Sequence, residues 1–162
     1  MTRFRWGVVA LVLAVIAATA LAGWVYFARY RPDQQTDDAA RQAADRSAED
    51  GAVAVLTYSP DNLTNDIAAA KSHLTGEFLA YYDKFTQAII GDATKQNQVK
   101  TTARIAEAAV AELHPDSAVV LVFVNKMTSS KDKPIPTLTP ATVRVTLTKV
   151  NGVWLISGFD PL

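Results

Sequence analysis

The feature that most constrains the fold is an uncharged apolar run from Trp6 to Phe27, WGVVALVLAVIAATALAGWVYF. A helix needs about twenty apolar residues to cross a hydrocarbon layer of roughly 30 Å, and this run has that length. Aromatic residues near its ends and arginines on both flanks are typical of a membrane span. We therefore predict a cytoplasmic tail over 1–5 and a transmembrane helix over 6–30.

A cleaved signal peptide is the alternative for this segment. Ala20 and Ala22 precede Gly23 with the small-residue spacing of a cleavage site. The chain stays apolar beyond that point, where a signal peptide would already be polar, so an uncleaved anchor is favoured. Arginines are balanced across the run, and the short tail is the simpler side to keep in the cytoplasm. We expect a single-pass protein of the cell membrane with an extracytoplasmic C-terminal domain.

The composition narrows the classes of partner. All sixteen acidic residues follow Pro32, with twelve of the sixteen basic ones, so this part of the 162-residue chain carries a net charge of −4. It is long enough for one domain with a core and too short for two ordinary ones. The sequence has no cysteine, which excludes disulfides and thiolate metal sites. An acidic domain without a basic stripe predicts no nucleic-acid partner.

An alanine-rich helix is predicted after Pro32, where the membrane helix ends or kinks. Alanines such as Ala44 and Ala48 recur there at helical spacing. Because alanine buries little apolar surface, the first half of this helix can stand solvated. We therefore interpret 31–58 as a linker and stalk helix, joined only by its C-terminal end to an α+β domain at 59–162.

Two more helices are predicted before the strands. The first is short and covers 67–72, and the second begins after Thr75, a residue type that caps helices. The second helix has an apolar face at i, i+4, i+7 and i+11, made of Phe78, Tyr82, Phe85 and Ile89.

From Thr101 onward the hydrophobic period changes to two, which is typical of strands. Four segments are predicted as strands: 101–113, 117–127, 141–150 and 153–159. The proline-rich stretch 128–140 is predicted as a long loop, and Asn151-Gly152 as a type I′ turn. Such short connections make the strands antiparallel neighbours, with the helices packed on one face of a curved four-stranded sheet.

The second predicted strand is apolar on both faces. We assign Val119, Leu121 and Phe123 to the face beneath the helices. The other face then needs a cover, which is a second copy, another subunit or the edge of the curled sheet itself. The residues predicted for a subunit contact, and hence for a homo-oligomer, are Ala118, Val120, Val122 and Val124.

The space between helices and sheet is predicted to be an apolar cup. The residues expected to line it include Phe78, Tyr82, Phe85, Phe123 and Trp154. None of the strand positions that face this cup titrates near neutral pH, and His73 and His114 have no partner at metal-ligand spacing. The common phosphate, nucleophile and zinc motifs are also absent. We predict no catalytic residue, no cofactor and no metal site, so the protein is not expected to be an enzyme.

The stretch VLTYSPDNLTNDI, from Val55 to Ile67, is conspicuously polar at its centre. Its oxygens could coordinate calcium, but Asp61, Asn62 and Asp66 do not follow the spacing of a calcium-binding loop. Residues of these types commonly cap helices and form turns. We interpret the stretch as a helix junction.

Four short motifs resemble the Mce-associated membrane proteins of actinobacteria. They are AVLTYSPD at 54–61, LTGEF at 74–78 followed by Tyr82, VLVFV at 120–124 and GVWLI at 152–156. The resemblance implies a domain similar to the periplasmic part of the secretion protein VirB8, itself similar to nuclear transport factor 2. It also implies an accessory of Mce lipid import systems, which contacts Mce transporter subunits or the permease and catalyses nothing.

Two alternatives remain open at this point. One is a scaffold subunit of a secretion channel, as the likeness to VirB8 implies. The other is a domain that binds a lipid or small hydrophobe in its apolar cup, since a pocket with few polar groups suits binding better than catalysis.

Overall fold

The computed structural model describes residues 18–21, 23–24, 36–87, 94 and 96–162. The chain divides into two compact units, Met1–Asp37 and Asp38–Leu162. In the first unit, 18–21 and 23–24 are helical, and the rest of the predicted span lies outside the described residues, as do the tail and Ile89. No helix among the residues described is both long enough and apolar enough to cross a membrane.

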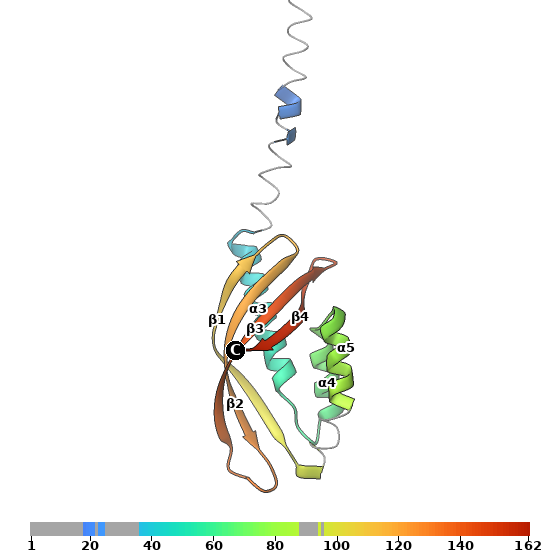
Figure 1. The fold of residues 1–162 in the computed structure, drawn as a ribbon, viewed down its shortest axis with the longest axis vertical. Helices are drawn as coiled ribbons and strands as arrows, with labels where there is room; N and C mark the ends of the chain where they lie inside the picture. Colours follow the sequence, from blue (N-terminus) through green and yellow to red (C-terminus); the bar gives the residue numbers. More distant parts are fainter. Residues whose placement is uncertain (1–17, 22, 25–35, 88–93, 95) are drawn as a thin grey trace, which may run out of the picture. The chain divides into compact units, whose positions relative to one another are not determined.

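The second unit has the predicted α+β order (Figure 1). Its described helices are α3 (Asp38–Leu56), α4 (Leu63–Ser72) and α5 (Gly76–Phe85). Its strands are β1 (Lys100–Leu113), β2 (Ser117–Ser129), β3 (Thr137–Val150) and β4 (Val153–Pro161). All neighbouring strands are antiparallel, in the order β1-β2-β3-β4, which confirms the predicted meander.

The turn between β3 and β4 is the one that its sequence predicts. Asn151 has φ 51° and Gly152 has φ 84°, and a type I′ turn requires positive φ at both central residues. This turn fixes the register in which Val150 pairs with Val153 and Lys149 with Trp154.

The loop between β2 and β3 is shorter than predicted. β2 continues to Ser129 and β3 begins at Thr137, so only 130–136 lie between the strands, and Thr128 still pairs with Thr137. Pro140 lies inside β3 without breaking its pairing. The Thr142 carbonyl accepts the Leu162 N–H on the β4 side, so Pro140, two residues earlier, directs its nitrogen to that side, beyond the end of β4. No ladder hydrogen bond is lost there, which is why proline is tolerated.

β1 carries two bulges that its alternation pattern conceals. Ala106 and Ala111 are the extra residues, because Ile105 pairs with Val124 but Glu107 with Phe123, and Val110 with Val120 but Glu112 with Val119. Each bulge bends the strand and returns an apolar side chain to the helix-facing side. The curvature of the long strands is visible in Figure 1.

The two faces of β2 are the reverse of those predicted. The predicted subunit-contact residues Ala118, Val120, Val122 and Val124 are all 1% exposed or less and belong to the core. The register explains this result, because Val120 pairs with Val145 and Val122 with Val143, and cross-strand partners share a face. With both faces apolar, β2 alone does not reveal its orientation. The well-patterned β3 does, once the register is known.

α3 is not a stalk. Ala44, in its first half, and Ala48, just past its midpoint, are fully buried, and α3 contacts all four strands. Small side chains allow this helix to lie close to the sheet. A Cβ at Gly51 would stand only 2.5 Å from Cδ1 of Ile156, a fully buried residue of β4. The compact unit therefore begins at Asp38 rather than at residue 59.

α4 starts earlier than predicted, at Leu63 and not at Ile67. α5 starts after Thr75 as predicted, although the Thr75 side chain makes no capping bond. The polar stretch before α4 is held instead by Asp66. Its carboxylate accepts hydrogen bonds from the Ser59 backbone N–H (2.9 Å), the Ser59 hydroxyl (3.2 Å) and the Asn62 amide (2.8 Å). This network makes the stretch a helix junction, as its composition indicates.

Candidate functional site

A cavity of about 540 Å³ lies where α5 faces the end of α3 and the end of β4. Most of the side chains around it are apolar or aromatic. Its lining residues are Val55, Leu56, Tyr58, Phe78, Tyr81, Tyr82, Phe85, Thr94, Val99, Phe159 and Pro161.

The aromatic wall of the cavity follows from the helical spacing on α5. Phe78 and Tyr82 lie one turn apart, with ring centroids 6.4 Å from each other. The Phe78 ring also stacks on Phe159 of β4, at 5.8 Å and 13° between ring planes. Tyr81 and Phe85 form a second stacked pair at 5.9 Å. Contacts at these separations stabilise aromatic pairs beyond the area they bury, so the wall is a packed surface.

Phe159 reaches the cavity because β4 has a bulge. Leu147 pairs with Ile156, but Thr146 pairs with Gly158, so Ser157 is the extra residue. If Ser157 were paired as a regular strand residue instead of bulged, the alternation that buries Trp154 and Ile156 would turn Phe159 outward. Phe159 is absent from the predicted lining, although a glycine inside a strand, here Gly158, is a signal for a bulge.

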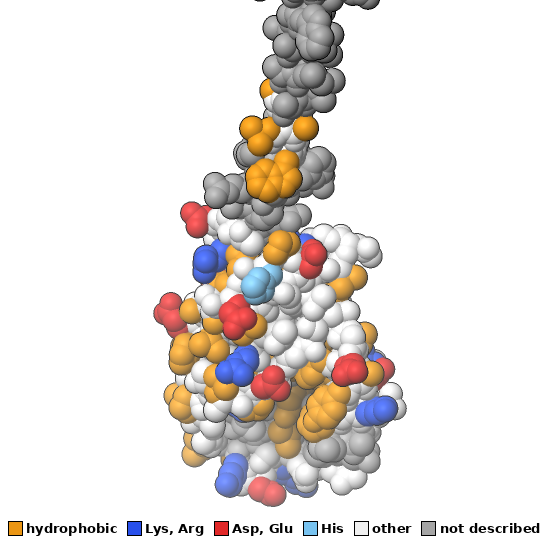
Figure 2. Space-filling view, turned by 45° about the horizontal axis from the view of Figure 1, so that its top comes forward, with side chains coloured by type: hydrophobic (Ala, Val, Ile, Leu, Met, Phe, Trp, Pro, Cys, Tyr) orange, Lys and Arg blue, Asp and Glu red, His pale blue; other side chains and the backbone are white. Residues whose placement is uncertain are grey.

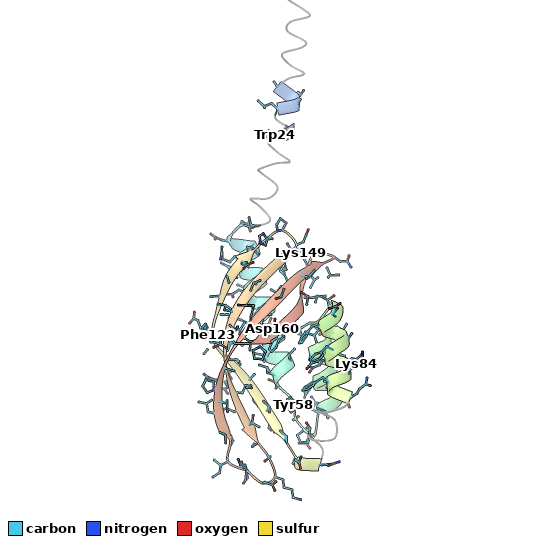
Figure 3. The ribbon with its side chains drawn as sticks, in the orientation of Figure 1. Trp24, Tyr58, Lys84, Phe123, Lys149 and Asp160 are labelled. Carbon is cyan, nitrogen blue, oxygen red and sulfur yellow. The ribbon has the colours of Figure 1, made fainter. Side chains whose placement is uncertain are left out.

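The polar groups of the cavity are mainly phenol hydroxyls. Tyr82 is 5% exposed, and its hydroxyl makes no hydrogen bond to the described residues. Burial, with smaller contributions from Tyr58 and Asp66, raises the pKa of Tyr82 to about 12. The Tyr82 phenol is therefore a neutral donor and acceptor at physiological pH. Tyr58 lies beside the lower part of α5 in Figure 3.

The structure brings only part of the predicted lining together. Phe78, Tyr82 and Phe85 lie at the cavity, but Phe123 and Trp154 do not. Phe123 is on the opposite face of the sheet, which Figure 3 shows at the side away from α5. Trp154 is buried, with the Lys149 ammonium 4.4 Å from its ring centroid.

A second feature is an exposed apolar surface on the helix-free side of β2 and β3. Phe123 and Met127 alternate onto this face, and Leu138 joins them as the cross-strand partner of Met127. Ile135 follows in the connecting loop. These four residues form the outer hairpin surface, and they are 43%, 42%, 59% and 81% exposed in that order.

The charged and metal-ligating side chains described in this unit do not point to a particular reaction or metal site. Figure 2 shows acidic and basic side chains intermixed on the face in view. Among the residues described, no three His, Asp or Glu side chains are grouped to hold a metal ion. Burial and the neighbouring acids Asp45, Asp50 and Glu107 raise the pKa of Glu49 on α3, but Glu49 does not line the cavity.

Comparison with solved structures defines the class of fold. An IcmL-like type IV secretion system protein from Legionella pneumophila aligns with a TM-score of 0.63 at 14% identity, over 78% of this chain and 93% of that one. VirB8 of Agrobacterium tumefaciens aligns with a TM-score of 0.59 at 11% identity, over 75% and 90%. The domain therefore has the VirB8-like fold.

Within that class the chain belongs to the family described as "Uncharacterized protein Rv1363c/MT1408-like", whose model matches residues 6–160. Uncharacterized protein Rv1362c of Mycobacterium tuberculosis is 54% identical over 95% of this chain and 70% of its own length. Outer membrane protein Rv1973 of the same organism is 39% identical over 94% and 91%. The predicted likeness to VirB8 is confirmed for the fold, and the relatives place the chain in a mycobacterial family.

Proposed function

We propose that the protein is a noncatalytic, membrane-anchored assembly subunit of an Mce-type lipid import system, and that it acts through protein contacts outside the membrane. The observation that carries the proposal is the VirB8-like fold, which solved type IV secretion system proteins share. The AVLTYSPD, LTGEF, VLVFV and GVWLI motifs support the narrower assignment to Mce systems.

Three observations support the placement of the domain outside the cytoplasm. The apolar run over 6–30 has the length and flanks of an anchor. A 39% identical relative is named an outer membrane protein, and a solved neighbour is the periplasmic domain of DotI. A single-pass anchor with an exported domain accounts for all three observations.

The outer hairpin surface is the contact that we assign to the partner protein. Monomeric domains seldom leave several large apolar side chains exposed together, and such patches mark interaction sites. Phe123, Met127 and Leu138 lie on one sheet face, so a flat partner surface can cover them at once. This surface replaces the predicted contact at Ala118–Val124, whose alternate residues are buried.

Co-purification tests the proposal. The tagged full chain is extracted in mild detergent from cells that express it natively, and the bound proteins are identified by mass spectrometry. We expect Mce transporter subunits or their permease to co-purify, and L138D to reduce that recovery severalfold. V153D is the matched control, because Val153 is 58% exposed but lies in the β3–β4 turn region.

Two outcomes would overturn the assignment. Recovery of neither Mce nor permease subunits from the wild-type chain would exclude the transporter. Equal recovery with L138D and V153D would exclude the outer hairpin surface. Recovery of secretion-channel subunits instead would support the second candidate, a VirB8-like channel scaffold, which the solved structures favour.

A further inference from the structure

We propose that the α5 cavity binds a small, neutral, largely apolar molecule with one hydroxyl or carbonyl group. This binding site does not depend on the assembly function, because the cavity and the outer hairpin surface lie on opposite faces of the sheet.

The cavity has the size and character of a ligand site. Its volume of about 540 Å³ lies inside the range of roughly 300–1,000 Å³ that small-molecule pockets occupy. Its wall is rigid, because Phe78 stacks on Phe159 across two elements. A flat or extended apolar body fits against these rings better than water does, since water would gain few hydrogen bonds there.

Tyr82 identifies the polar end of the ligand. Its side chain is more than nine-tenths buried and lines the cavity, yet its hydroxyl makes no hydrogen bond to the described residues. The hydroxyl oxygen is open to the cavity, so an oxygen on the ligand can accept the phenol proton there. Tyr58 lines the same cavity and offers a second hydroxyl close to the first.

The charge of the described residues around the cavity disfavours an anionic ligand. Among the described residues that line it, none is a lysine, arginine or histidine. The Asp66 carboxylate lies near enough to Tyr82 to oppose a negative charge on the phenol. A ligand carboxylate would therefore be buried without a cation and beside a like charge, which is strongly unfavourable. An alcohol or ketone meets neither penalty, so an alcohol should bind in preference to the acid of the same chain length.

Photolabelling tests this site on the full chain in lipid nanodiscs. The probe is 1-dodecanol carrying a diazirine in its chain, and labelled peptides are mapped by mass spectrometry. We expect labels on the peptides that contain Phe78 to Tyr82 and Phe159. Unlabelled 1-dodecanol should compete at a concentration at least about tenfold lower than dodecanoate, because only the acid buries a charge.

Two variants and one control distinguish binding of the probe in the cavity from its general partition into lipid. V99W fills the cavity and should abolish labelling of these peptides, whereas V153W, at an exposed position, should not. Y82F keeps the ring and should weaken competition by 1-dodecanol by about fivefold, the value of one hydrogen bond. If V99W does not fold, the competition measured with Y82F tests the proposal by itself. Labelling that avoids these peptides, equal competition by dodecanoate, or unchanged competition in Y82F would overturn the proposal.

Discussion

At the scale of single residues, Asp66 and Tyr82 show how differently two polar groups are used. Asp66 has its carboxylate engaged by Ser59 and Asn62, so it holds the junction between α3 and α4. Tyr82 is 5% exposed, and its hydroxyl lies at the cavity and makes no hydrogen bond to the described residues. The first group stabilises the fold, and the second is available to a ligand.

Replacing Asp66 should destabilise the domain. D66A removes the acceptor of three hydrogen bonds and leaves the Ser59 N–H, which is only partly exposed, without its partner. We expect the free energy of unfolding to fall by about 1–3 kcal/mol. Urea unfolding measures this change, with D61A as the control, because Asp61 is exposed in the same junction. Equal stabilities for D66A and D61A would contradict the role given to Asp66.

Tyr82 should make stability depend on alkaline pH. The phenol has a pKa of about 12 in the folded chain and about 10 in the unfolded chain. Between these values the unfolded state binds fewer protons than the native state, so the free energy of unfolding falls as pH rises from 10 to 12. Y82F removes this contribution, while the other tyrosines and the lysines remain in both chains. Urea unfolding at pH 9 and pH 11 should show a smaller loss in Y82F than in the wild type, and an equal loss would refute the shift.

At the scale of elements, the sequence predicts those features that depend on a hydrophobic period or on the residues of a turn. Asn151-Gly152 places β3 against β4, and the spacing of Phe78, Tyr82 and Phe85 orients α5. The predictions fail where the orientation of a side chain depends on how its strand pairs with a distant strand. β2 is apolar on both sides, so only its pairing with β3 reveals that Val122 is inside and Phe123 outside. The bulges at Ala106, Ala111 and Ser157 shift the alternation by one residue each. For this reason Phe159 was missed in the cavity.

The orientation of β2 can be tested with one pair of neighbours. V122A removes two methyl groups from a fully buried position and should cost about 2 kcal/mol. F123A removes a larger side chain, but one that is 43% exposed on the outer face, and should cost less than about 1 kcal/mol. Chemical denaturation of both variants measures the difference. A larger loss of stability in F123A than in V122A would support the predicted orientation of β2 instead.

At the scale of the whole molecule, α3 decides where the folding unit begins. Alanine content led to the prediction of a solvated stalk, because alanine contributes little burial per residue. The same small side chains let α3 lie directly on the sheet, with Ala44, Ala48 and Ala52 all fully buried. Close packing across a whole helix depends on the shape of the opposite surface, which a single sequence does not display.

Truncation should locate this boundary. A fragment that begins at Asp38 keeps all of α3 and should unfold in one cooperative transition. A fragment that begins at Ser59 loses α3 and exposes the sheet face that it covers, so we expect no cooperative transition and aggregation at micromolar concentration. Circular dichroism during urea titration distinguishes the two. Cooperative unfolding of the shorter fragment would show that α3 is dispensable.

The position of Pro140 has a consequence for solubility. β3 runs past the end of β4, so the stretch from Thr137 to Ala141 is a free strand edge, which could recruit a strand from a neighbouring copy. Proline at this edge removes one of the few backbone donors that such an intruding strand would need. Pairing with a neighbouring copy along this stretch of β3 is thereby disfavoured.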